Sequence, residues 1–419
     1  MKQIVIEGNK TLTGTIKVSG AKNSAVALIP AAILSNGIVT IENVPNISDI
    51  DALNEILEYL GAKVERNGSI MKIDSRNIVN KEIPEAISKK LRASYYFMSA
   101  LLGKFKKVEM YFPGGCSIGA RPIDQTLKGY KALGATVIED GNKYSISAEN
   151  LIGGHVYLDM PSVGATINTL LASVMADGET IIENAAKEPE IVNVATFLNN
   201  MGANIMGAGT NEIRIVGVSA LNGAYTEVIP DRIEAGTYVI AGALVGDNLR
   251  IENIIPDHIE ALLLKLKEMG FKMHIGSDYL EISKIDKLKP VRVKTLGYPG
   301  FATDLQQPLT TLLTKCNGVS KLEETIYENR FKNVSYLNKM GADIRLIDNR
   351  NIEVHGKTDL VGTTVTATDL RAGACLVLAG LAASGTTVIK EIEHVLRGYE
   401  DITTKLTNVG ANIKIEEYN

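Results

Sequence analysis

The segment LNNMGANIM (Leu198–Met206) combines the end of a helix, a glycine and a short apolar–polar alternation, and variants of it recur along the chain. Six such glycines are spaced by about 70 residues: Gly61, Gly134, Gly202, Gly270, Gly341 and Gly410. Glycine adopts the left-handed backbone conformation that ends many helices without steric cost. The alternation that follows each glycine predicts a half-buried strand. The repeat therefore predicts six copies of a surface helix followed by a strand.

A second, more apolar helix is expected upstream in every repeat. These helices are predicted at residues 23–34, 92–102, 165–175, 235–245, 305–313 and 370–381. Their Ala, Leu and Gly residues are apolar on all sides, so they belong in a core. A strand with β-branched residues follows each helix, so the fold class is α/β. Six repeats exceed what one core holds, and two groups of three are predicted, with a crossover near residues 224–234.

Composition excludes several classes of protein. The 419 residues are 45% hydrophobic and 22% charged with a net charge of −4, which is typical of a globular protein and lacks the basic excess of a nucleic-acid binder. Three cysteines cannot form a disulfide framework. No apolar run reaches the ~18 residues of a membrane span, and no signal peptide is recognisable, so a cytoplasmic location is expected. A protein-binding repeat scaffold is the alternative, but solenoid repeats are shorter than these.

One glycine-rich segment could carry chemistry. In PGGCSIGARPIDQ (Pro113–Gln125), Cys116 is framed by turn-forming residues and Arg121 follows five positions later. A nearby cation or a bound anion would tune the pKa of such a thiol, which could act as an acid or a nucleophile. The alternative is a small residue in a tight turn. Cys316 and Cys375 fall in predicted buried helices, where packing explains them.

A second group of polar residues lies near helix ends. Its members are Lys22, Asn23, Arg92, Asp304, Asp369, Arg371 and Arg397. Helix N-termini favour anions, and arginine pairs with phosphate or carboxylate through two parallel hydrogen bonds. Each residue alone could be a solvated charge or a cap, and Asp304 and Asp369 suit capping. Their recurrence in several repeats indicates an anion site. The five histidines are scattered, so no metal site is expected.

Seven motifs occur in one order along the chain. They are KNSA at Lys22, PGGCSIGARPID around Cys116, SVGAT from Ser162, TDLQQP from Thr303, ENRF from Glu328, TDLRAGA from Thr368 and RGYE from Arg397. Together they resemble the family of bacterial UDP-N-acetylglucosamine enolpyruvyltransferases (1-carboxyvinyltransferases). The resemblance covers the chain from the first strand to the last repeat.

The resemblance implies a two-domain inside-out α/β barrel with three repeats per domain. Residues 21–229 would form the domain with the Cys116 loop, and residues 1–20 plus 230–419 the second domain. The implied reaction transfers the enolpyruvyl group of phosphoenolpyruvate to the 3′-hydroxyl of UDP-N-acetylglucosamine and releases phosphate. This is the first committed step of peptidoglycan synthesis, which serves cell wall, shape and division. The implied partners are these two small molecules, with no cofactor, metal, nucleic acid or membrane.

The resemblance also implies roles for residues. Cys116 would be the general acid and could form a covalent adduct, while Asp304 would be the base and Asp369 would orient the reacting groups. The phosphoenolpyruvate-binding residues would be Lys22, Asn23, Arg121, Arg371 and Arg397. The UDP-N-acetylglucosamine-binding residues would be Arg92, Arg121, Pro122, Ile123, Asp124, Gln125, Ser162, Val163, Gly164, Asp304 and Ile326.

Two alternatives and one departure accompany this interpretation. Some members carry a lysine where this chain has Met160, so one nucleotide contact is replaced or lost. Since Cys116 is present, inactivation by the epoxide fosfomycin is expected. The rival 5-enolpyruvylshikimate-3-phosphate synthases lack the loop around Cys116. The other alternative is an inactive paralogue with a UDP-sugar-binding or regulatory role.

Overall fold

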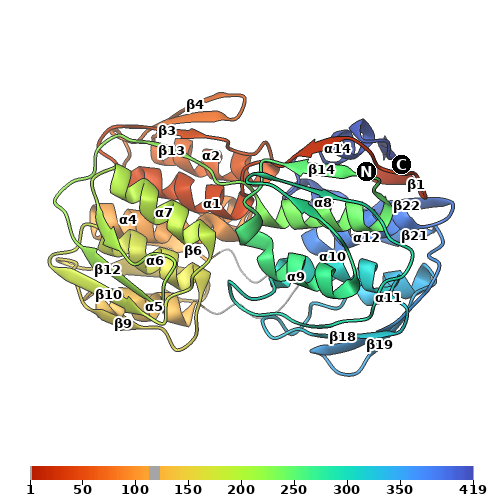
Figure 1. Ribbon diagram of the computed structural model, residues 1–419. Coiled ribbons are helices and arrows are strands. Elements are labelled where there is room, and N and C mark those ends of the chain that lie inside the picture. Colours follow the sequence, from red (N-terminus) through yellow and green to blue (C-terminus); the bar gives the residue numbers. More distant parts are fainter. Residues whose placement is uncertain (1, 113–122, 419) are drawn as a thin grey trace. The chain divides into compact units, whose positions relative to one another are not determined.

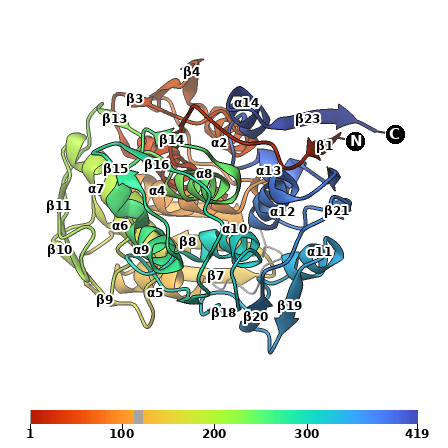
Figure 2. The ribbon, with the colours of Figure 1, turned by 45° about the vertical axis from the view of Figure 1, so that its right-hand side comes forward.

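The computed structural model describes residues 2–112 and 123–418, and their chain divides into two compact units. Residues 2–19 and 230–418 form unit 1, and the described residues between 20 and 229 form unit 2. Each unit has its own hydrophobic core. The labelled elements of both units can be followed in Figure 1 and Figure 2.

Unit 2 contains three sheets, with strand orders β13-β3-β5-β4, β6-β8-β7 and β11-β12-β10-β9 among its described residues. The strands are β3 (Ile38–Glu42), β4 (Lys63–Asn67), β5 (Ile70–Asp74), β6 (Lys107–Tyr111), β7 (Thr136–Asp140), β8 (Lys143–Ser147), β9 (His155–Tyr157), β10 (Glu179–Glu183), β11 (Asn204–Met206), β12 (Glu212–Val216) and β13 (Tyr225–Glu227). The helices are α1 (Lys22–Ala31), α2 (Ser48–Leu60), α3 (Glu85–Ser88), α4 (Tyr96–Phe105), α5 (Asp124–Ala132), α6 (Val163–Ser173) and α7 (Pro189–Asn200), with 3₁₀ turns η1 (Ala32–Leu34) and η2 (Arg92–Tyr95).

Unit 1 also contains three sheets, with strand orders β21-β22-β1-β23, β15-β16-β14-β2 and β17-β18-β20-β19. The strands are β1 (Lys2–Glu7), β2 (Thr15–Lys17), β14 (Leu249–Glu252), β15 (His274–Ile275), β16 (Tyr279–Ile282), β17 (Arg292–Lys294), β18 (Val319–Glu323), β19 (Asp343–Leu346), β20 (Asn351–His355), β21 (Thr364–Thr366), β22 (Thr386–Lys390) and β23 (Asn412–Glu417). The helices are α8 (Arg232–Val245), α9 (Glu260–Met269), α10 (Thr303–Leu313), α11 (Asn333–Lys339), α12 (Leu370–Ala382), α13 (Glu393–Leu396) and α14 (Ile402–Asn408), with the 3₁₀ turn η3 (Pro256–Ile259).

The apolar helices of the repeats form the two cores, as predicted. In unit 1, α8, α10 and α12 pack against one another, and every residue of α12 from Arg371 to Ala382 is buried. In unit 2, α4 packs against α1 and α6. One boundary differs from the prediction, because Arg92 lies in the 3₁₀ turn η2 and α4 begins only at Tyr96. Such a tightened first turn is common at helix N-termini.

The repeated glycines have the conformation that the sequence predicts. All six have positive φ, from 85° at Gly134 to 109° at Gly270. A short strand begins within two to four residues of each glycine, namely β4, β7, β11, β15, β19 or β23. The prediction of an α/β fold built from six repeats is therefore confirmed.

The two ends of the chain meet in one sheet of unit 1. Strand β1 pairs antiparallel with both β22 and β23, and Lys2 lies opposite Glu417. The chain leaves unit 1 after Ser19 and returns at Pro230, and the Asp231 amide donates to the Ser19 carbonyl at 2.9 Å. In the described part of the chain, no helix has the length and apolarity needed to span a membrane.

Candidate active site

Asp304 is the centre of a buried ion-pair network in unit 1. It lies in the first turn of α10, whose N-cap is Ala302, so Asp304 does not cap the helix as its position suggested. Its Oδ1 accepts a hydrogen bond from Arg330 at 2.7 Å, and its Oδ2 accepts one from Arg371 at 2.9 Å. Both arginines are almost fully buried, at 2% and 5% exposure of their side chains. The carboxylate is therefore held between two guanidinium groups.

The charges of this network shift the pKa of Asp304. Burial alone would raise the pKa of the carboxyl group, but the guanidinium groups of Arg371 and Arg330 outweigh burial and hold it well below its usual range. Asp304 is thus ionised throughout the physiological pH range. Burial would lower the pKa of Arg371, yet its pairing with Asp304 raises it overall.

A buried glutamate fixes the other side of the network. Glu324 is fully buried and accepts hydrogen bonds from Thr295 at 2.9 Å and from Thr303, the first residue of α10, at 2.8 Å. The hydroxyl of Thr303 in turn accepts from Arg330 at 3.2 Å. Glu324 also accepts from the amide of Ile326 at 2.8 Å. The start of α10 and the segment that carries Ile326 are therefore joined through one carboxylate.

The start of α12 carries two further predicted site residues of unit 1, Asp369 and Arg371. Asp369 is the N-cap and accepts hydrogen bonds from the amides of Arg371 and Ala372, both at 2.9 Å. The guanidinium of Arg371 donates to the Tyr399 hydroxyl at 3.1 Å. Arg397 follows directly after α13, two residues before this tyrosine. The predicted residues Asp304, Asp369 and Arg371 thus belong to one connected set of helix starts.

In unit 2, Lys22 opens the buried helix α1. Its ammonium group lies 2.6 Å from the carboxylate of Asp49, which is 3% exposed. The N-cap of α1 is Ala21, whose methyl group cannot cap the helix. The predicted residue Asn23 follows Lys22 in the first turn. A helix N-terminus beside a lysine is a favourable environment for an anion.

The SVGAT segment opens the buried helix α6. Ser162 is its N-cap and accepts a hydrogen bond from the Ala165 amide at 3.2 Å, and Val163 begins the helix. Gly164 lies against Tyr95, because a Cβ added at Gly164 would come within 1.9 Å of the tyrosine hydroxyl. A larger residue at this position would therefore force the Tyr95 side chain to move.

Arg92 and the start of α5 carry further predicted site residues of unit 2. The Arg92 guanidinium lies 5.2 Å from the ring centroid of Phe112. Ile123 precedes α5, and Asp124 begins it. Gln125 donates to Asp124 at 2.8 Å and to Asp159 at 3.0 Å.

Three predicted site residues, Cys116, Arg121 and Pro122, lie outside the described residues. The other two cysteines, Cys316 and Cys375, are fully buried, as predicted for core residues. Burial raises the pKa of each thiol to about 11, so neither is a reactive thiolate at neutral pH.

Sequence reasoning missed three charged residues of these networks. Arg330 was visible only as part of the ENRF motif, and neither Glu324 nor Asp49 was singled out. The contacts that reveal them join residues far apart in the chain, such as Arg330 and Asp304, which are 26 positions apart.

Comparison with known proteins identifies the family. Residues 6–406 match the family EPSP synthase (3-phosphoshikimate 1-carboxyvinyltransferase). The chain is 52% identical over 411 residues to UDP-N-acetylglucosamine 1-carboxyvinyltransferase 2 of Listeria innocua, covering 98% of this chain and 97% of the relative. It is also 52% identical to the protein of the same name from Bacillus subtilis, covering 99% of this chain and 96% of that one.

Solved structures agree with this assignment. The enolpyruvyl transferase NikO from Streptomyces tendae has a TM-score of 0.90 and 26% identity, covering 100% of this chain and 99% of that chain. An EPSP synthase from Acinetobacter baumannii has a TM-score of 0.76 at 20% identity, covers all of both chains and shares the fold. The chain is thus a transferase of the enolpyruvyl transferase family and belongs to its UDP-N-acetylglucosamine 1-carboxyvinyltransferases.

Proposed function

We propose that this protein transfers the enolpyruvyl group of phosphoenolpyruvate to the 3′-hydroxyl of UDP-N-acetylglucosamine, in the cytoplasm, as the first committed step of peptidoglycan synthesis. The observation that carries this proposal is the 52% identity to relatives named for this reaction over almost the whole chain. The sequence also supports this proposal, because the segment around Cys116 distinguishes this chain from the 5-enolpyruvylshikimate-3-phosphate synthases.

The reaction needs an acid and a base. The sugar hydroxyl oxygen bonds to C2 of phosphoenolpyruvate and loses its proton to a base, while an acid adds a proton to C3. The tetrahedral intermediate then loses a proton from C3 and breaks its bond to phosphate, which gives the enol ether and inorganic phosphate. In our proposal Cys116 is the acid and can also hold a covalent adduct with the donor. Asp304 is the base.

The network around Asp304 supports a carboxylate that gains basicity during the reaction. Two guanidinium groups keep it ionised, which also makes it a weak base. Arg371 is one of the proposed ligands of the donor anion. When Arg371 turns toward that anion, it releases one oxygen of Asp304, and the pKa of the carboxyl group rises. Binding of the donor would thus prepare the base.

Cations and helix starts support binding of the anionic donor. We assign this role to Lys22, Asn23, Arg121, Arg371 and Arg397. Lys22 combines an ammonium group with the uncapped start of α1, which is favourable for phosphate or carboxylate. Its partner Asp49 fixes the ammonium group at 2.6 Å.

The nucleotide sugar is assigned to a second set of residues. It comprises Arg92, Arg121, Pro122, Ile123, Asp124, Gln125, Ser162, Val163, Gly164, Asp304 and Ile326, with Asp369 orienting the reacting groups. The starts of α5 and α6 provide backbone amides in this set. Met160 is 62% exposed and offers no cation for a phosphate, so Arg92 and Arg121 carry the positive charge in this proposal.

Release of inorganic phosphate from phosphoenolpyruvate tests the proposal. The acceptors are UDP-N-acetylglucosamine and, in a separate reaction, shikimate 3-phosphate. We expect release with the nucleotide sugar only. Release with shikimate 3-phosphate alone would favour the rival activity, and no release with either from folded protein would favour an inactive paralogue.

Two variants and one inhibitor make this test specific. Asp304→Asn should lower kcat by at least about a hundredfold, the lower end of what acid–base catalysis contributes. Asp343→Asn, on the exposed strand β19, is the matched control and should retain full activity. Fosfomycin should abolish phosphate release by alkylating Cys116. Full activity after complete alkylation of that thiol would remove Cys116 from the mechanism.

A further inference from the structure

Unit 1 contains a pocket of about 310 Å³ that no proposed catalytic or substrate-binding residue lines. It lies where α8, α10 and α12 end and where the loops before β2 and after β16 pass over them. Its lining residues are Asn9, Lys10, Thr11, Ala243, Leu244, Val245, Lys284, Ile285, Asp286, Leu288, Leu312, Lys315, Lys357 and Ala382. This volume is within the range of small-molecule sites in proteins.

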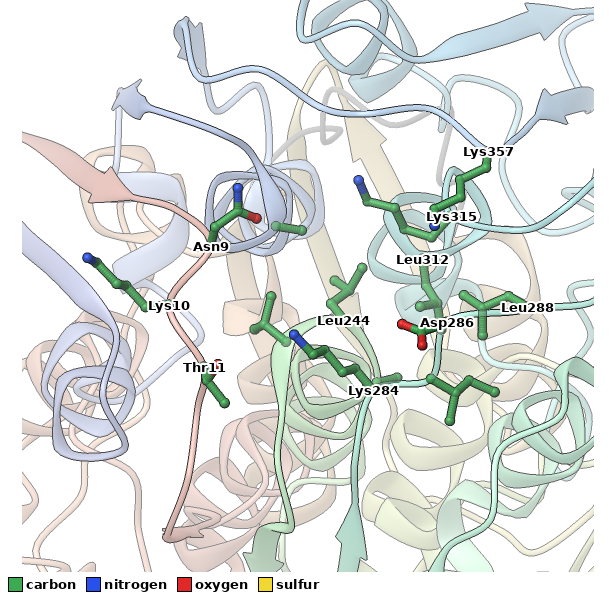
Figure 3. A pocket seen from close by; sticks show the side chains of 14 residues that line it. Asn9, Lys10, Thr11, Leu244, Lys284, Asp286, Leu288, Leu312, Lys315 and Lys357 are labelled. Atoms are coloured by element: carbon green, nitrogen blue, oxygen red, sulfur yellow. The ribbon is translucent and has the colours of Figure 1, made fainter.

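Lysines dominate the polar part of this pocket. Four lysines and a single aspartate, Asp286, line it. Figure 3 shows that the ammonium group of Lys10 is turned away from the other labelled side chains. The pocket therefore has a positive charge that its own carboxylate does not balance.

Two of these lysines have no structural partner within the described chain. Lys284 and Lys357 are exposed and form no ion pair or side-chain hydrogen bond with any described residue. Lys315 is half-buried, and its ammonium group donates to the Thr358 carbonyl at 3.1 Å. Burial lowers the pKa of Lys315. Lys284 and Lys357 are thus available to a ligand.

Neutralisation of helix ends does not explain these lysines. The C-terminal end of a helix has a partial negative charge, and lysines are common there. In this pocket, however, backbone amides already bind a carbonyl group near the ends of α8 and α12. Leu12 donates to Val245 at the end of α8, and Asn9 donates to Leu381 near the end of α12, both at 2.9 Å.

Unit 2 contains a lysine at a helix end whose ammonium group does bind backbone carbonyls. Lys104 lies in the last turn of α4 and donates to the carbonyls of Ile33 at 2.8 Å and Ser35 at 2.9 Å. Two of the three N–H groups of its ammonium are thus bound by the backbone. Lys284 and Lys357 have no such contacts with described residues, so their ammonium groups can pair with a ligand.

The chemistry of the pocket defines its ligand. Its lining combines the ammonium groups of the lysines with the apolar residues Leu244, Ile285, Leu288 and Leu312. We propose that this pocket binds a small organic anion that carries at least two phosphate or carboxylate groups. The anionic groups would pair with Lys284, Lys315 and Lys357, and the carbon skeleton would contact the exposed parts of Leu244 and Ile285.

The pocket is separate from the proposed active-site residues of unit 1. Asp304 lies in the first turn of α10, whereas Leu312 lies in its last turn. Eleven residues at 1.5 Å each make α10 about 16 Å long. Asp369 and Ala382 are separated in the same way by α12. The inference does not depend on the proposed function.

Lysine footprinting tests this inference on the full chain without an activity assay. The protein is treated briefly with an amine-acetylating reagent in the presence of citrate, inorganic pyrophosphate or sodium chloride, at equal ionic strength. The modification of each lysine is then measured by mass spectrometry. At about ten times the Kd of the anion, acetylation of Lys284 and Lys357 should slow about tenfold, because only unoccupied protein reacts. Lys267 and Lys272, exposed residues of the same unit outside the pocket, are the internal controls.

A variant separates a site from general screening of charge. Lys357→Gln should reduce the protection of Lys284, whereas Lys272→Gln should leave it unchanged. Protection by citrate alone would indicate a polycarboxylate ligand, and protection by pyrophosphate alone a phosphorylated one. The inference would be overturned if Lys284, Lys357, Lys267 and Lys272 were each acetylated at the same rate in citrate, in pyrophosphate and in chloride. Protection of Lys284 that persists in full in Lys357→Gln would also overturn it.

Discussion

Arg330 holds one oxygen of Asp304 while Arg371 holds the other, so each arginine sets the acidity of the carboxylate. In Arg330→Met the pKa of Asp304 should rise, and the acid limb of the pH profile of kcat/KM should move to higher pH. Removal of one member of a buried ion pair should also cost about 3 kcal/mol of stability. Phosphate-release kinetics across pH and thermal unfolding measure the two effects.

Matched variants show whether Arg330 positions Asp304 or only supports the fold. Arg330→Lys keeps the positive charge and should restore most of the pH profile. Arg345→Met removes an exposed arginine paired with Asp343, at 3.2 Å, and should change stability by less than about 1 kcal/mol. If Arg330→Met lowered stability but left the pH profile of the folded enzyme unchanged, Arg330 would not be a positioning residue.

Glu234, in the first turn of α8, gives unit 1 a pH-dependent stability. Burial raises its pKa to about 7, although the ammonium group of Lys405 lies 2.5 Å away and opposes the shift. The folded state therefore binds a proton that the unfolded state releases near the ordinary pKa of 4.5. This contribution to stability is complete below pH 4.5 and is lost as pH rises to about 7.

The variant Glu234→Gln should remove this dependence. Across that pH interval the free energy of unfolding of the unmodified protein should fall by up to roughly 3 kcal/mol more than that of the variant, at 1.36 kcal/mol per pKa unit. Urea unfolding at several pH values measures it. Glu260→Gln, at an exposed position of α9, is the control. Parallel stability curves for Glu234→Gln and the unmodified protein would contradict the assignment.

The sequence identified many of the charged residues of the site but not their pairings. Lys22, Asp304, Asp369 and Arg371 were recognised because they lie at or near helix starts, a local property. Their partners were not, since an ion pair depends on tertiary structure: Asp304 and Arg371 are 67 residues apart. The roles of these residues in catalysis stay predictions.

The element that recurs in both units is the helix that ends at a left-handed glycine. At Gly202 φ is 105° and an added Cβ would have no neighbour closer than 3.9 Å, so a substitution there strains the backbone alone. Gly202→Ala should cost about 1 kcal/mol. Gly202→Asn should cost less, because asparagine tolerates this conformation. Thermal unfolding of both variants measures these costs. Equal losses of stability in the two variants would mean that packing around residue 202, and not its positive φ, determines the cost.

The N-cap of α12 combines two functions that one pair of variants can separate. Asp369→Ala removes the acceptor of two amide hydrogen bonds and should cost about 1 kcal/mol. Asp369→Asn keeps an acceptor and should retain the melting temperature. If the charge orients the reacting groups, Asp369→Asn should still lower kcat more than it changes KM. Normal kcat in Asp369→Asn would leave Asp369 with a capping role only.

Helices and glycine turns could be predicted because their patterns are local. The buried helices have long apolar runs, and each glycine marks an end. A short strand before each buried helix was expected, but the bounds and partners of these parallel strands could not be predicted in the same way. Strands such as β2, β9 and β13 have three residues each, too few for a recognisable alternation, and their partners are fixed by the fold.

The connectivity of the whole chain predicts that unit 1 can close without unit 2. The amide of Asp231 donates to the carbonyl of Ser19, so the exit and return points of unit 1 lie next to each other. A chain in which a short glycine linker joins residue 19 to residue 230 should fold cooperatively, and so should residues 20–229 alone. Circular dichroism and thermal unfolding measure this. As a control, removal of residues 1–7 should prevent folding of unit 1, since β1 lies between β22 and β23.

The pairing of β1 with β23 also sets an order of events during translation. The described residues of unit 2 all lie between residues 20 and 229, so all their strands have been synthesised by residue 229. Strand β1 is synthesised first but borders β22 and β23, which are made last. At about 5–20 residues per second, β1 waits roughly 20–80 seconds for its neighbours. The nascent chain must therefore keep the apolar face of β1, with Ile4 and Ile6, from mispairing until synthesis is complete.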